Sequence, residues 1–421
     1  MYQNTYDLIV VGGGLTGVAA SVSAARAGLS VLLLEKDGCL GGAMSNGLVY
    51  PFMKYWLKQE NEVERKYLSA GIFTEMRERL YRYHPETNDQ YFNSEFFKIV
   101  FDDMTTEAGV SLLFHALVID ASTDGRRLSG VRVATKSGVL ELQANYFIDA
   151  SGDGDLLALA GCDFQLGRDA DGYCQPMTTC FRVGGVDVAA FLAEKPKLQE
   201  IWRAEQAAGK ITNPRENILT FQGLGEGVVH FNTTRVVKHD PTNAFDVSRA
   251  EVTARHQIAE IMAFLKEHSP ACKNAVLLAS AQHIGVRESR KLRGVHILTA
   301  EELKAEARFP DAIAAGNYAI DIHSPTGTGT ELYYFKAGEY YQIPYRALLP
   351  RELDNLLVAG RCISATHEAQ ASVRIMPICA TLGEAAGNAA ALAHKHGQSA
   401  HEINVAELQD ILRANGAVLE I

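Results

Sequence analysis

The first fifty residues alternate between short apolar runs and one alanine-rich stretch. The segment Asp7–Val11 is apolar and rich in β-branched residues after its first position, which is typical of a parallel strand buried on both faces. A glycine-rich loop and a helix-forming stretch follow, Gly28 ends that helix, and Ser30–Leu34 forms a second apolar strand. This order predicts a strand–loop–helix–strand unit of a doubly wound α/β fold.

Apolar runs and helical periodicity continue along the rest of the chain. Further strands are predicted at Leu112–Ile119, Tyr146–Ala150, Thr178–Val183, Val228–Val237, Ala279–Ile284 and in the apolar run from Asn355 to Gly360. Helices are predicted at Lys66–Arg82, Asn93–Ala108, Ser248–His268 and Ile378–His394. The mixture of buried strands and helices again favours an α/β protein.

The glycine loop after the first strand has the spacing G-x-G-x-x-G at Gly12, Gly14 and Gly17. Gly12 makes the tight turn, Gly14 lets the backbone approach a pyrophosphate, and Gly17 lets the helix pack closely on the strand. The amide groups of the first helical turn, which include those of Leu15 and Thr16, can then hold the phosphate charge. Because strand, loop and helix are all present, the motif predicts a dinucleotide site.

Glu35 and a second glycine pair indicate which dinucleotide is bound. Glu35 ends the second strand, where its carboxylate can accept hydrogen bonds from both hydroxyls of an adenosine ribose and would repel the 2′-phosphate of NADP. Gly41 and Gly42 begin a second loop of small residues, which allows close backbone approach along the ribityl chain of FAD. An NAD dehydrogenase has less need of this loop, so the pattern favours FAD. The neighbouring residues expected at the cofactor are Lys36, Ala43 and Met44.

The C-terminal part of the chain carries a second set of residues expected at the flavin. The last apolar strand ends at Gly360 and Arg361, and Pro377 fits the first turn of an Ala- and Gly-rich helix. A helix N-terminus aimed at the flavin would stabilise the anionic reduced ring. Gly383 and Gly387 stand four residues apart, a spacing that lets this helix pack tightly on a neighbour. Further cofactor contacts are expected at Ala150, Ser151, Gly152, Ser372 and Arg374.

Composition and charge remove several classes of protein. Hydrophobic residues make up 47% and charged residues 21% of the 421 residues, which excludes a disordered or collagen-like chain. The net charge of −10 and the lack of a Lys/Arg run argue against nucleic acid or anionic lipid as the main partner. The seven cysteines are scattered and form no C-x-x-C pair, so neither a disulfide framework nor a metal site is predicted. With no secretory signal and no run of about 20 apolar residues, we expect a cytoplasmic protein without a membrane segment.

Motifs along nearly the whole chain resemble the FAD-dependent oxidoreductase family, which is distantly related to the fumarate reductase and succinate dehydrogenase flavoproteins. They are VVGGGLTGVAA, LLLEKDGCLGGAMSNG, DASGDGDLLALAG, GVRESRKLRG, YAIDIHSP, YQIPYRALLP and the long C-terminal segment that begins NLLVAGRC. The resemblance implies a glutathione-reductase-type FAD fold with an inserted substrate domain, and a backbone contact of Val118 with adenine. Gly360–Arg361 departs from the Gly-Asp pair that usually ends the flavin-proximal strand of flavoprotein hydroxylases.

We therefore predict an α/β fold in which a Rossmann-like FAD-binding domain is discontinuous. Residues 1–160 and 345–421 are expected to form this domain, and residues 161–344 an inserted α+β substrate, or cap, domain. The sequence has no second strand–glycine loop–helix unit, so a separate NAD(P)H domain is not expected.

Three residues of the inserted segment are candidates for the chemistry on the substrate side. His323 follows Asp321 by two residues, so in a strand both side chains would lie on one face, and the carboxylate could orient the imidazole and favour its protonated form. The same spacing serves a structural polar pair equally well. Arg287 and Arg290 can clamp a substrate carboxylate through their planar guanidinium groups, or they can form an ion-pair network that braces the two domains. The next candidates for the acid or base are Tyr341 and Glu288.

These features predict an FAD-dependent dehydrogenase or reductase. It would transfer a hydride between flavin N5 and a small polar substrate, which can carry a carboxylate, and would exchange electrons with a separate donor or acceptor. Two alternatives stay open at this point. One is an oxygen-using monooxygenase or oxidase, and the other is an electron-transfer subunit that has no small-molecule chemistry of its own.

Overall fold

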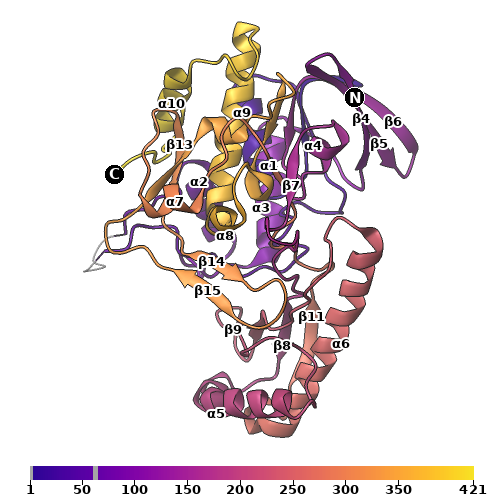
Figure 1. Ribbon diagram of the computed structural model, residues 1–421, viewed down its shortest axis with the longest axis vertical. Helices are drawn as coiled ribbons and strands as arrows, with labels where there is room; N and C mark the ends of the chain where they lie inside the picture. The colour runs from indigo at the N-terminus through magenta and orange to yellow at the C-terminus, as the bar shows by residue number, and fades with distance from the viewer. Residues whose placement is uncertain (1–2, 60–64) are drawn as a thin grey trace.

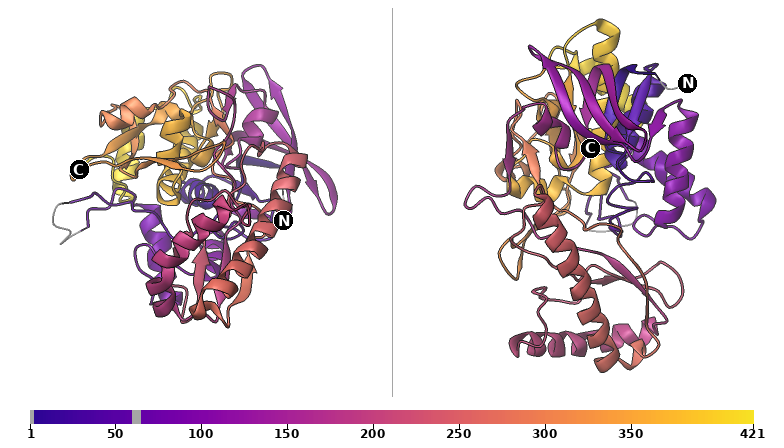
Figure 2. Two further views of the ribbon diagram at one scale, coloured as in Figure 1. Left: turned by 60° about the horizontal axis from the view of Figure 1, so that its bottom comes forward. Right: turned by 90° about the vertical axis from the view of Figure 1, so that its right-hand side faces the viewer.

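The computed structural model describes residues 3–59 and 65–421, which form an upper and a lower part in the view of Figure 1. The upper part contains the largest sheet and the helices α1 (Leu15–Arg26) and α9 (Met376–His396). The lower part is built from the middle of the chain and contains a smaller sheet and the long helices α5 (Val188–Ala207) and α6 (Ala244–His268). The first strand and the C-terminal helix α10 (Val405–Ala414) both belong to the upper part, which Figure 2 shows from two further sides.

The largest sheet has the strand order β3-β2-β1-β6-β5-β4, with β17 paired to the last residues of β6. Strands β3, β2, β1, β6 and β17 pair in parallel, whereas β4, β5 and the first half of β6 form an antiparallel meander. Because β1 and β2 are parallel neighbours joined by α1, the predicted α/β class is confirmed. The bounds are β1 Thr5–Val11, β2 Val31–Leu34, β3 Ser111–Leu113, β4 Leu117–Asp124, β5 Arg127–Thr135, β6 Gly138–Asp149 and β17 Leu356–Val358.

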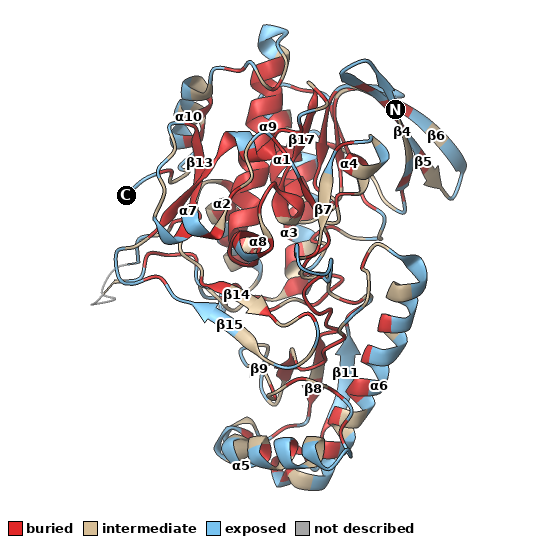
Figure 3. Cartoon of the chain, viewed as in Figure 1, coloured by how far each residue is buried: buried red, intermediate tan, exposed pale blue. Residues whose placement is uncertain are grey.

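Helices α1 and α9 form the buried centre of the upper part (Figure 3) and pack through two glycines of α9. A Cβ atom on Gly383 would lie 2.2 Å from the carbonyl oxygen of Thr16, and one on Gly387 would lie 2.2 Å from that of Ala20. Such distances are far inside van der Waals contact, so only glycine permits this approach. The spacing produces the close packing predicted from the sequence. Because Gly383 meets Thr16 and Gly387 meets Ala20, the two helices run in the same direction and their N-termini lie at the same end of the pair.

Glu384 is a buried carboxyl in α9 whose ionisation is linked to stability. Its Oε2 accepts a hydrogen bond from the amide of Ile72 at 3.0 Å. Burial raises the pKa of Glu384 from 4.5 to about 7, although the Ile72 amide and Arg26 favour the ionised form. The folded state therefore keeps a proton that the unfolded state releases. The stabilising contribution of this group is complete below the unfolded pKa and is lost as the pH rises through about 7.

A Glu384→Gln variant is therefore expected to be more stable than the wild type at alkaline pH. The amide cannot ionise, and its oxygen can still accept the hydrogen bond from Ile72. Denaturant unfolding at about pH 8.5 should show a gain of up to about 3 kcal/mol, and the gain should vanish near pH 5. A gain of equal size at both pH values would show that this carboxyl does not titrate as described.

The helices begin and end where local signals place them. The helix predicted from Lys66 is α2, which begins only after Gly71, a residue with a φ of 61°. The helix predicted from Ser248 is α6, which begins four residues earlier because the Asn243 side chain accepts hydrogen bonds from the amides of residues 245 and 246. Helix α5 was not predicted, and it contains Pro196. The remaining helices are α2 Ile72–Tyr83, α3 Ser94–Glu107, α4 Asp155–Leu159, α7 Ala300–Lys304, α8 His367–Val373, α10 Val405–Ala414 and the short 3₁₀ helices η1 Pro270–Cys272, η2 Tyr345–Leu348 and η3 Gly360–Cys362.

Several predicted strands are shorter, shifted or divided. The strand predicted at Leu112–Ile119 is divided into β3 and β4, because the backbone turns at His115 with a φ of 52°. The three strands predicted in the middle of the chain correspond to β8, β10 and β11, which together with β9 form a sheet of order β11-β8-β10-β9. The bounds are β8 Phe181–Gly184, β9 Thr220–Phe221, β10 Val229–Phe231 and β11 Val276–Ser280, and the two-stranded sheets consist of β7 Phe164–Leu166 with β12 Arg290–Leu292, β13 Ala312–Gly316 with β16 Tyr341–Pro344, and β14 Ile320–His323 with β15 Thr330–Tyr333.

The smaller sheet has one apolar and one polar face. Phe181 and Phe231 point to the apolar face, where they join a core with Trp202 of α5. Arg182 and His230 alternate with them and are paired in register, so they lie on the opposite face. The ring of His230 lies 5.3 Å from that of Tyr50, so the polar face is turned toward the upper part.

The division of the chain into a cofactor domain and an inserted domain stays a proposal. Part of the segment assigned to the insert packs with the upper part, since Leu298, Leu303, Ile313 and Ile343 belong to the same core as α1 and α9. Residues 177–285 are thus the segment whose packing is most separate from the large sheet.

No single helix within residues 3–59 and 65–421 is long and apolar enough to cross a membrane. By length and composition alone, α8 and α9 taken together would be long and apolar enough to cross a membrane. The two helices, however, meet at a bend of 93°. Residues 377–393 of α9 are buried within the protein.

Candidate active site

The first glycine loop has the geometry that its sequence predicts. A Cβ atom on Gly12, whose φ is +100°, would lie 2.5 Å from the carbonyl oxygen of Ala150, and one on Gly17 would lie 1.8 Å from that of Gly12. Gly14 differs from both, because a Cβ there would meet no atom within 4 Å. Gly12 and Gly17 are therefore required by the fold itself. Gly14 instead leaves open space beside the first turn of α1, where helical amides have no partner within the helix.

The second glycine loop lies directly against the first. The amide of Gly41 donates to the carbonyl of Gly13 at 2.8 Å, and Gly41 also forms a parallel bridge with Gly14. A Cβ atom on Gly42 would lie 3.0 Å from Cα of Gly14. Ala43 is exposed next to this contact and Met44 is buried. Ser45 is also buried, and its Oγ has no hydrogen-bond partner among the described residues.

Glu35 is buried at the end of β2 and faces the first glycine loop. Its two carboxylate oxygens accept hydrogen bonds from the amides of Gly13, at 2.7 Å, and Asp37, at 2.8 Å. Each oxygen keeps one lone pair for a further donor. Burial raises the pKa of Glu35, while these two amides favour the charged form. The neighbouring Lys36 is exposed and forms an ion pair with Asp37.

The turn after β6 is held by Asp149, a fully buried carboxylate. It accepts hydrogen bonds from the amide and hydroxyl of Ser151 and from the amide of Leu157. Ala150 is thereby placed beside Gly12. A Cβ atom on Gly152 would lie 2.9 Å from the Arg361 guanidinium, so this turn also contacts the end of β17.

The residues between β17 and α9, in the C-terminal part of the chain, also lie beside the first turn of α1. A Cβ atom on Gly360, whose φ is +85°, would lie 2.5 Å from Oγ1 of Thr16 in the first turn of α1. Arg361 follows it and forms an ion pair with Asp153 at 2.9 Å. Pro377 lies in the first turn of α9, as predicted. Ser372 hydrogen-bonds to the carbonyl of Tyr318 and the hydroxyl of Tyr341. Val118, the residue expected at the adenine, is buried near the start of β4.

These residues fit FAD. The open space at Gly14, the parallel N-termini of α1 and α9, and the unpartnered Ser45 hydroxyl lie where a long dinucleotide would be held. The loops 12–17 and 41–45 would hold its phosphates and ribityl chain, and Glu35 its adenosine ribose.

On the substrate side, His323 and Asp321 lie on one face of β14, as their spacing predicts. Nε2 of His323 lies 3.5 Å from Oδ2 of Asp321, and Nδ1 lies 3.1 Å from Oγ1 of Thr330. The predicted preference for a protonated imidazole is wrong for the free protein. Burial and the positive charge of Arg287 lower the pKa of His323 to about 3, which outweighs the attraction of Asp321.

The structure separates Arg287 from Arg290, which the sequence had grouped. Nη1 of Arg290 contacts Oδ1 of Asp155 at 2.9 Å and the carbonyl of Asp153 at 3.1 Å, so this side chain ties β12 to α4. Arg287 donates instead to the carbonyl of Pro176 and the hydroxyl of Thr178, and its positive charge helps to lower the pKa of His323. The bracing role therefore suits Arg290, and the clamping role of Arg287 stays a prediction.

The family model for FAD dependent oxidoreductases matches residues 7–412. This chain belongs to the FAD-dependent oxidoreductase family. It is 27% identical over 197 residues to digeranylgeranylglycerophospholipid reductase 1 of Methanococcoides burtonii, an alignment that covers 44% of this chain and 46% of that protein. It is 26% identical over 180 residues to protein FixC of Bradyrhizobium diazoefficiens, with 37% of this chain and 39% of that protein covered. The chain thus spans less than half the length of these curated relatives.

A solved structure has the same fold. The geranylgeranyl bacteriochlorophyll reductase-like protein of Thermoplasma acidophilum superposes with a TM-score of 0.50 at 14% identity, over 98% of this chain and 84% of that one. Membership of the family makes FAD the cofactor of this oxidoreductase.

A Glu35→Ala variant of this oxidoreductase is expected to bind FAD roughly tenfold or more weakly. It removes up to two charge-assisted hydrogen bonds to the ribose, each worth about 1.5–3 kcal/mol. Titration of the apoprotein with FAD, followed by flavin fluorescence, measures the change. The exposed Glu141 provides a control, because Glu141→Ala should leave the affinity unchanged. Wild-type affinity in Glu35→Ala would place the adenosine elsewhere.

The sequence did not reveal a buried ionic network that joins the segment around β12 to α8. Glu288 is fully buried and contacts Nδ1 of His367 at 2.7 Å and Nζ of Lys291 at 2.5 Å. Lys291 also donates to the carbonyl of Gly167. Glu288 is thus fully engaged, and Tyr341, the other reserve candidate, is buried with its hydroxyl on Ser372. The i, i+3 spacing of Glu288 and Lys291 was the only signal in the sequence.

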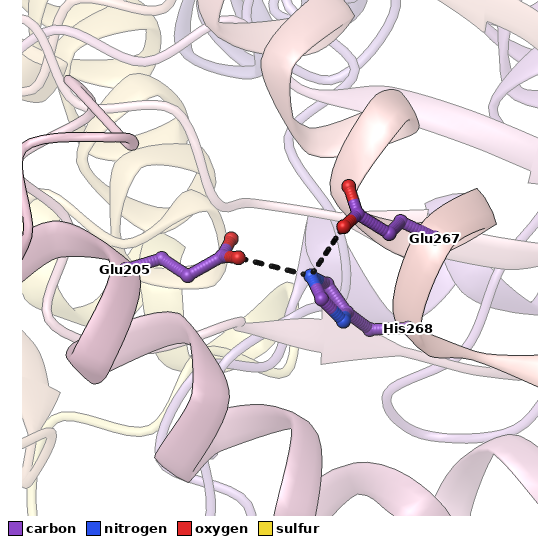
Figure 4. Close-up of side chains that lie close together, drawn as sticks. All are labelled: Glu205, Glu267 and His268. Atoms are coloured by element: carbon purple, nitrogen blue, oxygen red, sulfur yellow. Dashed lines mark hydrogen bonds and ion pairs between the residues drawn. The ribbon is translucent and has the colours of Figure 1, made fainter.

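Within the described residues, one group of side chains has metal-like geometry. Figure 4 shows that Glu205 of α5 and Glu267 of α6 both approach His268, at 3.1 and 3.8 Å. Lys210 brings a positive charge within 3.7 Å of Glu205, and the ring of Phe264 lies 4.8 Å from that of His268. We interpret the group as an ion pair that ties the ends of α5 and α6 together.

Proposed function

We propose that this oxidoreductase is a dehydrogenase or reductase that transfers a hydride between FAD and a small polar substrate that carries a carboxylate. A separate donor or acceptor would exchange electrons with the enzyme. The observation that carries the proposal is the meeting of Asp321 and His323 with Arg374, whose Nη2 lies 3.9 Å from Oδ2 of Asp321. Because Arg374 lies between α8 and α9, the imidazole and carboxylate are held next to the segment expected at the flavin.

Each residue of this group has a defined task in the proposed reaction. When bound, FAD supplies the acceptor or donor of the electron pair. His323 is neutral and can take up a proton from the substrate, while Asp321 and Thr330 fix the ring orientation. A negatively charged substrate beside the ring would raise the pKa of His323, so the imidazole becomes a better base when the substrate is present. Arg287 would hold the substrate carboxylate.

Anaerobic screening of a metabolite panel for bleaching of the flavin absorption tests this proposal. A substrate that reduces the flavin in the absence of oxygen, and whose product carries no added oxygen atom, is the expected result. Rapid reoxidation in air with an oxygenated product would instead identify a monooxygenase. Bleaching only by a protein electron donor, with no response to any small molecule, would identify an electron-transfer subunit.

A further inference from the structure

A cavity of about 590 Å³ lies between α1, α2, α9 and α10. Its walls are the last turn of α1 with the turn after it, the first turn of α2, one face of α9 and the C-terminal end of α10. A volume of roughly 300–1,000 Å³ is typical of sites for small molecules. Helix α1 has 12 residues and is roughly 18 Å long, so the cavity lies at the opposite end of this helix from the first glycine loop.

The wall from α9 presents its polar side chains on one face of the helix. Glu384, Asn388 and Lys395 line the cavity at spacings of four and seven residues, which one face of a helix brings together. Glu384 is 2% exposed and Asn388 is 4% exposed. Gly383 and Gly387 each precede one of these two residues directly and contact α1. The cavity therefore lies beside the tight contact of α1 with α9.

Glu384 is a buried acid that lacks a cationic partner. Its Oε2 accepts a hydrogen bond from the amide of Ile72 at 3.0 Å, and the Asn415 side chain also favours its ionised form. No cation forms an ion pair with Glu384 in the part of the chain that the structure describes. Arg26 also lines the cavity, but both of its Nη groups donate to Glu75, at 2.6 and 2.8 Å. The charge of Arg26 is therefore already compensated.

The other charged groups around the cavity are paired as well. Burial raises the pKa of Glu384 to about 7, and the negative charge of Glu75 adds to this increase. Glu384 is thus the acid at this cavity that a cation would stabilise. The remaining pairs are Arg79 with Glu75 and Glu107 at 2.9 and 2.7 Å, Lys395 with Glu407 at 3.2 Å, and His394 with Asp7 at 3.6 Å.

The cavity combines hydrogen-bond acceptors with an apolar wall. Nδ2 of Asn388 donates to the carbonyl of Glu384 at 2.9 Å, which leaves Oδ1 of Asn388 as an acceptor. The hydroxyl-bearing Ser23 lines the α1 side. The apolar wall consists of Leu29, Ile72, Leu392 and Ile411. A ligand that fits these walls carries a positively charged donor group at one end and hydrocarbon at the other.

We propose that this cavity binds a small organic cation, a primary ammonium group joined to a short apolar chain. The ammonium group has three N–H donors, which match the carboxylate of Glu384 and Oδ1 of Asn388, and the chain lies against the apolar wall. A bare metal ion fits less well, because it needs several oxygen ligands and would leave the apolar wall uncovered. The site is independent of the proposed reaction, since it shares no residue with the group around His323.

Binding of three molecules of the same size to the FAD-loaded protein tests the charge preference. n-Butylammonium, n-butanol and butyrate are compared at pH 8 and matched ionic strength, by calorimetric titration and by the shift in melting temperature. We expect n-butylammonium to bind roughly tenfold or more tightly than the other two and to raise the melting temperature. Equal binding of n-butylammonium and n-butanol overturns the proposal. A potassium salt that binds as tightly as n-butylammonium would identify a site for inorganic cations and also overturns it.

The pH dependence of n-butylammonium binding identifies the acid that holds it. An alkylammonium group keeps its proton up to about pH 9. Glu384 must be ionised to pair with it, and its pKa in the free protein is raised to about 7. The affinity should therefore rise by up to about tenfold per pH unit from pH 5 to about 7 and level off above that. An affinity that stays constant from pH 5 to 9 would contradict the role of Glu384.

Two variants of α9 locate the site. Glu384→Gln should keep FAD and bind n-butylammonium no more tightly than n-butanol, and Asn388→Ala should weaken n-butylammonium binding by roughly three- to tenfold. Glu301→Gln, at an exposed position of α7, is the matched control and should bind like the wild type. Each shift in melting temperature is taken relative to the same variant without ligand, because Glu384→Gln itself changes stability. Wild-type binding of n-butylammonium by Glu384→Gln would place the cation elsewhere and overturn the proposal.

Discussion

A Gly14→Val variant is expected to fold like the wild type and to lose FAD. Gly14 has a φ of −69° and an extended ψ, which valine adopts readily, and a Cβ at this position meets no atom within 4 Å. The added side chain would occupy the space that lets the backbone approach a pyrophosphate. Losing about two charge-assisted hydrogen bonds of about 1.5–3 kcal/mol each corresponds to a decrease in FAD affinity of roughly 100-fold or more. Circular dichroism of the apoprotein and FAD titration measure the two properties separately.

Gly17→Val provides the matched control for this variant. Its Cβ would lie 1.8 Å from the carbonyl oxygen of Gly12, and neither backbone can move away without disrupting the contact of β1 with α1. This variant should therefore fail to fold, whereas Gly14→Val folds and fails only to bind. FAD binding by Gly14→Val at wild-type affinity would contradict the assignment of the phosphate site.

A His323→Ala variant is expected to bind FAD normally and to reduce its flavin with substrate about 10²–10⁴ times more slowly, the usual range for loss of a positioned proton-transfer group. Single-turnover traces under anaerobic conditions measure this step directly. Because the pKa of His323 is lowered to about 3 in the free protein, the group is already deprotonated at neutral pH. The dependence of kcat/KM on pH should therefore show no acid limb from this residue above about pH 4.

The exposed His256 of α6 provides the control for that experiment. His256→Ala should leave the rate of flavin reduction unchanged. His323→Asn retains a side chain that can hydrogen-bond to Thr330, so it should show whether orientation alone supports part of the rate. If His323→Ala reduces its flavin at the wild-type rate, the histidine has no part in the reaction.

The two glycine loops could be recognised in the sequence because their motifs are local. Gly12, Gly14 and Gly17 lie within six residues, so their spacing is visible in the sequence, although the contact that requires glycine at position 12 is with the distant Ala150. The pair Gly383 and Gly387 is similar, since one helical turn places both on one face. Asp149 was missed, because a carboxylate at the end of a strand has no distinctive sequence pattern until the following turn closes around it.

The sequence by itself determined the α/β class, the two glycine loops and the position of Glu35, since these depend on residues close together in the chain. Only the tertiary structure placed Arg374 beside Asp321, because these residues come from separate segments. It also showed that Arg290 pairs with Asp155, apart from Arg287, and that the pKa of His323 is lowered. The physical reason is that charge interactions and desolvation depend on distance and burial in space, and neither quantity follows from spacing along the chain.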